Sequence, residues 1–375
     1  MTQKKNILII LGTRPEIIKL SPLIRSCEEA GLEYTTIHTG QHYSDNLDAV
    51  FFEQLELPTP EYNLEVGSQS HGAQTGEMLI KIEEVLLDEE PDTVVVQGDT
   101  NSVLAGAIAT SKLDMELAHV EAGLRSFDDR MPEETNRVLT DHTADYLFAP
   151  TEEAAELLHE ENIHESVYVT GNTVVDAVSQ NIKLAEKKSD VLSELDLHET
   201  DYALMTAHRA ENVDDRETFV RILDGVAQAA RELGLTVVYP IHPRASDKLD
   251  EFDIPVPDPI RLIEPQDYLD FLVLERNASI IFTDSGGVQE EACILNVPCV
   301  TVRKSTERPE TLDVGANTLA GSSPIEIRDQ AIRMHGENET WTNPFGDGKA
   351  AEYILDVLLQ DSEPQPEIKS PASTD

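Results

Sequence analysis

The feature that most constrains the fold is the alternation of short apolar runs with helical patterns along almost the whole chain. Each run is followed by a loop and then by a segment whose apolar residues have helical spacing. Strands that are apolar on both faces and separated by helices are typical of parallel sheets covered by helices on both sides. We predict strands at residues 6–11, 93–96, 117–120, 146–149, 167–169, 202–205, 236–239, 260–263, 279–282 and 299–302.

About a dozen strands are too many for one ordinary domain of 150–200 residues, so the 375-residue chain is predicted to form two. Both are expected to be doubly wound, Rossmann-like α/β domains that face a cleft, the first over residues 1–171 and the second over 172–348. A C-terminal helix over 349–360 is expected to pack back on the first domain. Residues 361–375, rich in Pro, Ser, Glu and Asp, are expected to be disordered.

Charge excludes several kinds of partner. The chain has 28 Lys and Arg against 72 Asp and Glu, a net charge of −44 that is spread over helix faces such as 152–161. Nucleic acid and anionic membranes would be repelled, and no apolar run of roughly 18 residues is present to span a bilayer. The start of the chain lacks a cleavage site, which favours a cytoplasmic protein. We interpret the acidic surface as salt adaptation, since the Debye length is only about 3 Å in molar salt.

Neither the cysteines nor any nucleotide fingerprint indicates a metal or a cofactor. Cys27, Cys293 and Cys299 form no CxxC pair and are expected to be small buried side chains in a reducing compartment. His38 and His42 flank residues 39–41 without an acidic or cysteine partner, so no metal is expected. The sequence contains neither GxGxxG nor GxxxxGK[ST], which argues against NAD, FAD and ATP.

One candidate anion site follows the first predicted strand, where ligands of open parallel sheets sit. In the segment GTRPEIIK, Gly12 permits a tight turn and Pro15 suits a first helical position. The helix start is expected to offer free N–H groups, and Arg14 and Lys19 add two cations one turn apart. The alternative is two cations on a solvated helix face.

A second candidate anion site follows the strand at 279–282, in the segment TDSGGVQEE. Ser285 can cap the following helix, and Gly286 and Gly287 let a ligand approach the backbone closely, as in a phosphate cradle. The alternative is a plain capped turn. Three further strand-end loops carry imidazole or cations, at 206–212 with His208, at 241–244 with His242, and at 303–308 with the sequence RKSTER.

Carboxylates follow strands of the first domain. Asp99 lies in GDT, Glu121 in HVEAG, and Glu133 and Glu134 open a helix in MPEETNR. Clustered carboxylates push their pKa values apart, so that one can hold a proton while another acts as a base. The alternative for Glu133 and Glu134 is an ordinary interaction with the helix dipole.

These segments, in this order, resemble the non-hydrolysing UDP-N-acetylglucosamine 2-epimerases, here in a salt-adapted, archaeal form. The matching segments run from Gly12 to Gly348, and GTRPE, VEAGLR and DSGGxQEE are the most specific. The resemblance implies a glycosyltransferase-B-like fold with the active site between the domains, a homodimer and no cofactor. It also implies reversible interconversion of UDP-N-acetylglucosamine and UDP-N-acetylmannosamine, through elimination of UDP and its re-addition to 2-acetamidoglucal, for polysaccharide or glycan synthesis.

By the same resemblance, Asp99, Glu121 and Glu133 are the acid/base candidates, with His208 also in the catalytic set. Glu291 would hold the ribose, Gln266 and Phe271 the uracil, and Arg14, Arg308, His208 and the Ser285–Gly287 turn the diphosphate. The full set of implied substrate-binding residues is Arg14, Lys19, Asp99, Glu121, His208, Gln266, Phe271, Ser285, Gly286, Gly287, Glu291 and Arg308.

One departure from the family pattern concerns activation by substrate, which in bacterial members uses a second site beside the active site. Ser44 and Glu77 stand where a glutamine and an arginine are expected, whereas Gln41 and His242 are retained. We therefore expect weak or altered activation by UDP-N-acetylglucosamine. Three other functions remain open on the sequence: a sugar transferase of the same fold, a hydrolysing epimerase, and a catalytically silent sensor of nucleotide sugars.

Overall fold

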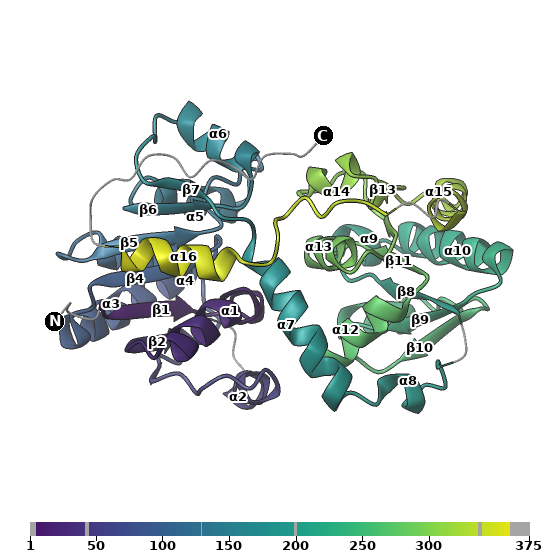
Figure 1. The fold of residues 1–375 in the computed structure, drawn as a ribbon. Coiled ribbons are helices and arrows are strands. Elements are labelled where there is room, and N and C mark those ends of the chain that lie inside the picture. The colour runs from purple at the N-terminus through teal and green to yellow at the C-terminus, as the bar shows by residue number, and fades with distance from the viewer. Residues whose placement is uncertain (1–4, 42–44, 129, 199–200, 337–339, 361–375) are drawn as a thin grey trace. The chain divides into compact units, whose positions relative to one another are not determined.

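The computed structural model describes residues 5–41, 45–128, 130–198, 201–336 and 340–360, which fold into two α/β units (Figure 1). The first unit comprises the chain up to Ala177 together with residues from Phe345 onward, and the second comprises Val178–Pro344. The chain leaves the first unit within helix α7 (Thr173–Lys188), just after the predicted boundary at residue 171. It re-enters shortly before the predicted boundary at residue 348. The expected disordered tail, 361–375, lies outside the described residues.

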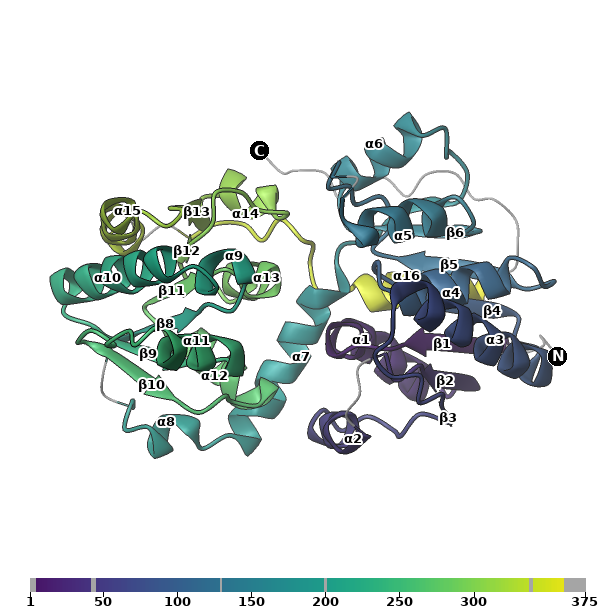
Figure 2. The same cartoon turned by 180° about the vertical axis from the view of Figure 1, so that it is seen from behind.

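The first unit is a seven-stranded parallel sheet in the order β3-β2-β1-β4-β5-β6-β7. Helices α1 and α16 lie on one face (Figure 1), and α3 and α4 on the other (Figure 2). The strands are β1 (Ile7–Leu11), β2 (Tyr34–His38), β3 (Tyr62–Asn63), β4 (Thr93–Gln97), β5 (Glu116–Val120), β6 (Tyr146–Ala149) and β7 (Val167–Val169). The helices of this unit, besides the start of α7, are α1 (Arg14–Ala30), α2 (Asp45–Gln54), α3 (His71–Glu89), α4 (Asn101–Thr110), α5 (Pro132–Asp141), α6 (Glu152–Glu160) and α16 (Ala350–Leu359).

The second unit is a six-stranded parallel sheet in the order β10-β9-β8-β11-β12-β13, again with helices on both faces. Its strands are β8 (Tyr202–Thr206), β9 (Thr236–Pro240), β10 (Ile260–Ile263), β11 (Ile280–Thr283), β12 (Cys299–Thr301) and β13 (Asn317–Leu319). Its helices, after α7, are α8 (Val191–Glu194), α9 (Ala210–Val213), α10 (Arg216–Leu233), α11 (Pro243–Glu251), α12 (Tyr268–Asn277), α13 (Gly286–Ile294), α14 (Pro309–Asp313) and α15 (Pro324–Gly336).

The predicted fold class is confirmed, and each of the ten predicted strands is present. Three strands were not predicted, namely β2, β3 and β13. Strand β2 begins with the polar sequence Tyr-Thr-Thr, and β3 and β13 are only two and three residues long, so none has the apolar run that marks a buried strand. All three lie at or near a sheet edge, where a strand needs less apolar surface.

The strand order defines one switch point in each sheet. In the first unit the chain runs from β1 outward through β2 and β3, then returns to place β4 on the other side of β1. In the second unit β8 and β11 have the same relation. Ligands of open α/β sheets bind at such points, beyond the carboxyl ends of the strands. The predicted segments GTRPE, GDT, HRAEN and DSGG directly follow β1, β4, β8 and β11.

Apolar burial on both sides makes the central strands rigid supports for these loops. All five residues of β1 and of β4 are buried. Helix α4 approaches them closely at Gly106, where a Cβ atom would meet the side chains of Ile10 and Val96. Cys27, Cys293 and Cys299 are buried and unpaired by disulfides, as predicted. In the described ranges, no helix combines the length and apolarity needed to cross a bilayer.

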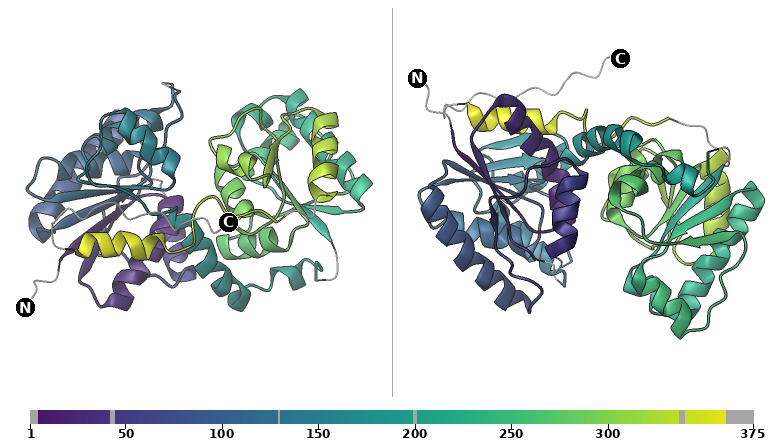
Figure 3. Two further views of the ribbon diagram at one scale, coloured as in Figure 1. Left: turned by 45° about the horizontal axis from the view of Figure 1, so that its top comes forward. Right: turned by 90° about the horizontal axis from the view of Figure 1, so that it is seen from below.

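Helix α16 belongs to the first unit although it lies at the end of the chain. It packs beside α1, and its course along that unit is visible in yellow in Figure 3. The buried carboxylate of Asp176, on α7, accepts hydrogen bonds from the backbone N–H groups of Ala350 (3.2 Å) and Ala351 (3.1 Å). Asp176 thus caps the start of α16 and joins it to the segment that leads out of the unit.

We expect Asp176→Ala to loosen α16 by about 1–2 kcal/mol, the typical cost of losing a helix cap. Asp176→Asn, which keeps an oxygen acceptor, should lose less. Hydrogen exchange of the α16 amides, followed by mass spectrometry, measures both. Equal protection in the Ala variant and the wild type would contradict the capping role.

Candidate active site

The first switch point is bridged by a buried carboxylate, Glu16, in the first turn of α1. Its Oε2 atom accepts hydrogen bonds from the N–H groups of Gly12 (2.6 Å) and Thr13 (2.8 Å). Its Oε1 atom accepts one from the hydroxyl of Thr100 (2.5 Å), in the loop after β4. Glu16 therefore fastens the loops that follow two adjacent strands. Gly12 is required here, because a Cβ atom would collide with the Ser102 side chain.

This arrangement corrects the prediction of free N–H groups at the start of α1. The N–H groups of Gly12 and Thr13 are bound by Glu16, whose own N–H donates to the Thr13 side chain in a capping box. Pro15 has no N–H to offer. Arg14 is exposed, with its guanidinium 5.8 Å from the centre of the Phe51 ring.

Glu121, at the end of β5, lies among donors. The Lys19 ammonium is 2.7 and 2.9 Å from its two oxygens, the Gln97 amide donates to Oε2, and the Asn172 amide lies 3.4 Å from Oε1. Four N–H contacts are typical of an ionised carboxylate. The prediction gave Lys19 to an anion site, whereas the structure pairs it with Glu121.

The backbone of Glu121 is in the left-handed region, with φ of 71°. For a residue with a Cβ atom this conformation costs of order 1–3 kcal/mol and persists only where the surroundings enforce it. The side chain of Glu121 is 6% exposed. Glu56, Glu65 and Glu90 of the same unit also have positive φ, but they are exposed. Glu121 combines the strained backbone with burial, and strain of this kind is concentrated at functional sites.

Asp99 and Glu134 share one arginine. Arg137, on α5, forms ion pairs with Asp99 and with Glu134 (3.1 Å to the latter), and the Asn136 amide donates to the Asp99 carbonyl at 2.9 Å. Helix α5 thus holds the loop after β4. Glu133, which precedes Glu134 in the first turn of α5, is partly exposed.

Glu134 holds a neighbouring loop in place, which is more than the ordinary interaction with the helix dipole considered from the sequence. Its carboxylate accepts hydrogen bonds from the N–H and hydroxyl of Ser126 (2.9 and 2.8 Å) and from the N–H of Phe127 (3.0 Å). Burial by itself would raise the pKa of Glu134, but these bonds and Arg137 outweigh it and lower the pKa. Glu134 therefore fixes the loop after VEAGLR as an ionised group.

The second switch point is bridged by Asp284, which is fully buried. Its carboxylate accepts hydrogen bonds from the N–H groups of His208 (3.0 Å) and Arg209 (3.0 Å) and from the Asn212 amide (2.9 Å). The His208 ring nitrogen Nδ1 lies 3.2 Å from it. Burial by itself would raise the pKa of Asp284, but the contacts with His208 and its neighbours lower it. Asp284 was absent from the predicted site.

The predicted glycine cradle lies directly after Asp284. Ser285 occupies the N-cap position of α13, but its side chain makes no capping bond, which corrects that prediction. A Cβ atom on Gly286 would meet nothing within 4 Å, and one on Gly287 would meet only the Ser285 hydroxyl, at 4.0 Å. The backbone at the start of this nine-residue helix is thus open to close approach, unlike the start of α1.

The two arginines of the RKSTER segment are paired with carboxylates. Arg308 lies 2.6 Å from Glu290, which is buried on α13. Arg303 is itself buried and contacts Glu307 (2.8 Å) and Glu211 (3.3 Å). These pairs attach the segment after β12 to α13 and to the loop after β8.

The implied nucleoside-binding residues lie near α12. The buried Glu291 interacts with the hydroxyl of Tyr268, whose pKa is raised by burial and by the charges of Glu291 and Glu275. The Gln266 amide donates to the Glu264 carbonyl at 2.8 Å, and Phe271 is half-buried on α12.

The structure describes three of the four residues named for the activation site, namely Gln41, Glu77 and His242. Gln41 is buried and accepts hydrogen bonds from the N–H (3.1 Å) and hydroxyl (2.8 Å) of Ser102. Glu77 is partly exposed on α3 and pairs with Lys81 at 2.8 Å, and His242 caps α11. Ser44 and His42 lie outside the described residues.

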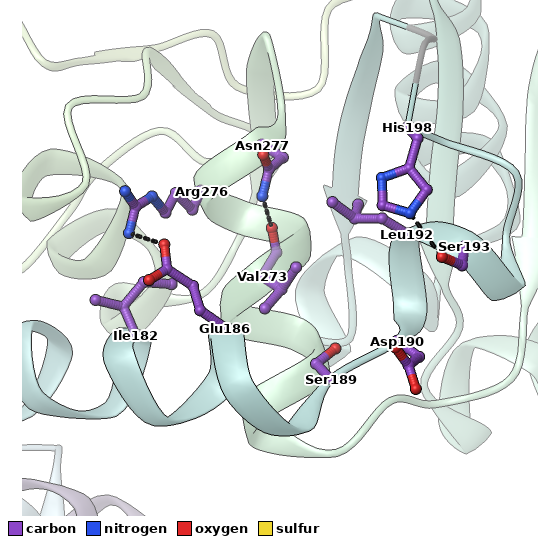
Figure 4. Close-up of a pocket in the computed structure, with 10 residues that line it drawn as sticks. All are labelled: Ile182, Glu186, Ser189, Asp190, Leu192, Ser193, His198, Val273, Arg276 and Asn277. Carbon is purple, nitrogen blue, oxygen red and sulfur yellow. Dashed lines mark hydrogen bonds and ion pairs between the residues drawn. The ribbon is translucent and has the colours of Figure 1, made fainter.

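A pocket of about 260 Å³ in the second unit lies apart from the predicted site residues (Figure 4). It is lined by the end of α7, by α8 with the residues that lead to β8, and by the end of α12, which leads to β11. These segments precede the strands, so the pocket is at the amino edge of the sheet. Its lining includes the Glu186–Arg276 ion pair (2.8 Å) and the His198–Ser193 hydrogen bond (2.6 Å) but none of the predicted site residues.

Comparison with known proteins agrees with the motifs. Residues 25–359 match the model of a protein family described as UDP-N-acetylglucosamine 2-epimerase. A relative from Methanocaldococcus jannaschii, named UDP-N-acetylglucosamine 2-epimerase, is 54% identical over 357 residues, covering 93% of this chain and 98% of the relative.

The chain belongs to the UDP-N-acetylglucosamine 2-epimerase family. A crystal structure of the M. jannaschii UDP-GlcNAc 2-epimerase in complex with UDP-GlcNAc and UDP superimposes with a TM-score of 0.84 and covers 94% of this chain and 99% of that one. Another epimerase relative, from Pseudomonas aeruginosa, is 39% identical, covers 94% of this chain and 99% of its own, and is named UDP-2,3-diacetamido-2,3-dideoxy-D-glucuronate 2-epimerase. The two-domain, glycosyltransferase-B-like fold predicted for an epimerase of this family is thus confirmed.

Glu16 gives this epimerase-family fold a testable dependence on pH. Burial raises the pKa of Glu16 to about 7, although its hydrogen bonds oppose the shift. The folded state therefore holds a proton that the unfolded chain has lost between about pH 4.5 and 7. Stability of the first unit should fall by roughly 3 kcal/mol across that window, at 1.36 kcal/mol per pKa unit.

We expect Glu16→Gln to remove most of this pH dependence while its amide oxygen keeps the two backbone acceptor bonds. Urea unfolding at pH 5 and pH 7.5, in one salt, measures the difference between the variant and the wild type. Glu152→Gln, at an exposed position in α6, is the matched control. The same pH slope in the Glu16 variant and the wild type would refute the assignment.

Proposed function

We propose that the chain catalyses the reversible epimerisation of UDP-N-acetylglucosamine to UDP-N-acetylmannosamine at C2 of the sugar. The observation that carries the proposal is Glu121, a strained carboxylate held by Lys19 and two side-chain amides, within a chain that belongs to this family. The M. jannaschii relative, 54% identical, has been crystallised with UDP-GlcNAc and UDP, which supports the same nucleotide sugar here.

The chemistry requires a base near C2 and an anion site for the leaving group. The C2 proton is not adjacent to a carbonyl, so direct removal is difficult. When the C1–O bond breaks, UDP leaves with the electron pair and the developing oxocarbenium ion acidifies the C2 proton. Loss of that proton gives 2-acetamidoglucal. Re-addition of UDP at C1, with a proton delivered to the other face of C2, gives the epimer.

The residues divide between these two tasks. Glu121 is proposed to take or return the C2 proton, with Asp99, Glu133 and His208 supporting acid–base transfer. The open backbone at Ser285–Gly287, with Arg14 and Arg308, is proposed to stabilise the diphosphate as charge grows on it. Glu291 is proposed to hold the ribose, and Gln266 and Phe271 the uracil.

Proton NMR of UDP-N-acetylglucosamine with the pure protein, in D₂O at roughly 2–3 M KCl, tests the reaction. The Debye length at molar salt is only about 3 Å, so repulsion between the surface carboxylates is screened. UDP-N-acetylmannosamine carrying deuterium at C2 is the expected product. Free N-acetylmannosamine with UDP would instead indicate a hydrolysing enzyme. An unchanged spectrum would contradict the proposal, and exchange with UDP-2,3-diacetamido-2,3-dideoxy-glucuronate alone would redirect the substrate. A parallel assay at low salt tests the salt adaptation.

We expect Glu121→Gln to abolish more than about 99% of turnover, because general acid–base groups contribute typically 10²–10⁴-fold. The affinity for UDP should stay within about twofold, since Glu121 is assigned to the sugar and not to the nucleotide. Initial rates by NMR and calorimetric titration with UDP measure the two quantities. Glu116→Gln, at the other end of β5, is the control, and normal turnover of the Glu121 variant would overturn its role.

A further inference from the structure

A buried ion pair lies behind the candidate acid–base residues of the first unit. The side chain of His119, on β5, and that of Asp141, at the end of α5, are both fully buried. The His119 nitrogen Nδ1 is 2.6 Å from Asp141 Oδ1, and Nε2 is 2.9 Å from the carbonyl oxygen of Gly98. The proposed reaction assigns no task to either side chain.

The hydrogen-bond partners determine the state of the pair. The Gly98 carbonyl can only accept, so Nε2 donates to it. The second oxygen of Asp141 accepts from the Gly123 N–H (3.2 Å) and from Arg125 (2.7 Å), as an ionised carboxylate does. Burial by itself would raise the pKa of Asp141, but His119 and Arg125 outweigh it and lower the pKa. Both ring nitrogens of His119 therefore face acceptors, an arrangement that suits a doubly protonated ring.

This pair touches each segment of the first unit that carries an acid–base candidate. Gly98 directly precedes Asp99, and His119 lies two residues before Glu121. Asp141 closes the helix whose first turn contains Glu133.

The turn around Glu121 needs such external support. Glu121 and the glycines at 98 and 123 all have positive φ, of 71°, 83° and 83°. Gly123 has no space for a side chain, because a Cβ atom would collide with the Ala154 carbonyl. A charged hydrogen bond to Gly98 holds the loop after β4, and another to Gly123 holds the turn after β5.

We propose that the His119–Asp141 ion pair is a positioning device that sets the geometry of Glu121 and Asp99 for proton transfer. The inference rests on the proposed function, since it concerns the same carboxylates. Neither residue touches the substrate in this scheme. Their effect passes through the backbone of the loops after β4 and β5, where a displacement of 1 Å costs on the order of 10²-fold in rate.

The pair also offers a control within its own network. Arg125 continues to Glu161 through two contacts (2.7 and 2.9 Å), and Glu161 meets His142 at 3.1 Å. The His142 side chain is 46% exposed. His142→Gln therefore changes a histidine of the same network without entering its buried part, and turnover should stay within about twofold of the wild type.

His119→Gln should lower kcat about 10- to 100-fold and leave the dissociation constant of UDP within about twofold. A purely structural role would lower the melting temperature and leave kcat of the folded protein unchanged. Initial rates by NMR, UDP titration and thermal melts, all at one salt concentration, separate the two. Two downfield ring N–H signals in the wild type, both absent in His119→Gln, report the imidazolium directly.

Asp141→Asn provides a second variant should His119→Gln fail to fold. Its amide oxygen still accepts from Gly123 and Arg125, while the amide nitrogen faces His119 and removes the ionic bond. The double variant His119→Gln/Asp141→Asn should lose no more rate than the worse single variant, because the two residues act as one unit. Losses that multiply would contradict the proposal.

The outcomes distinguish this inference from the proposed function. Exchange of the C2 proton by the wild type, with unchanged kcat in folded His119→Gln or Asp141→Asn, would overturn the positioning role alone. Absence of exchange by the wild type would overturn the proposed function and this inference with it. A loss of kcat accompanied by an equal loss of UDP affinity would also reject a role confined to the proton-transfer carboxylates.

Discussion

The site depends on a carboxylate placed at the switch point of each sheet. Loops from adjacent strands diverge there, and a polar side chain must hold them together without filling the space that a ligand needs. Glu16 does this between the loops after β1 and β4, and Asp284 between the loops after β8 and β11. Each accepts several backbone or side-chain N–H and O–H bonds, so its removal would leave buried donors unsatisfied.

The two carboxylates have opposite effects on the accessibility of the backbone at the start of the helix beside each of them. Glu16 comes from the first turn of α1 and consumes the N–H groups around that helix start, so an anion there must rely on side chains such as Arg14. Asp284 directs its bonds back to the loop after β8, and the glycines that open α13 stay accessible. Equivalent positions in two related sheets therefore differ in how much backbone they leave open to a phosphate.

The sequence was sufficient for the fold because apolar runs such as those of β1 and β4 are buried on both faces, which only a covered parallel sheet explains. It located the site loops because they follow strands. It did not identify Asp284 or Asp141, since nothing in a local pattern distinguishes a carboxylate that binds its own backbone from one that faces a ligand. It assigned Lys19 to an anion because the contact with Glu121 joins residues 102 positions apart. Spacing along the chain carries no information on such pairs.

The pairing of cations also bears on how a chain of net charge −44 can act on a diphosphate. Three cations near the candidate residues form ion pairs with protein carboxylates and so are already neutralised. Lys19 pairs with Glu121, Arg137 with Asp99 and Glu134, and Arg308 with Glu290. In the proposed reaction Glu121 becomes neutral when it takes the C2 proton, at the moment when negative charge develops on the leaving group. Lys19 thus favours the ionised form of Glu121 that accepts the proton, while the proposed anion site relies on the open backbone of Ser285–Gly287, so the reaction needs no surplus of positive charge.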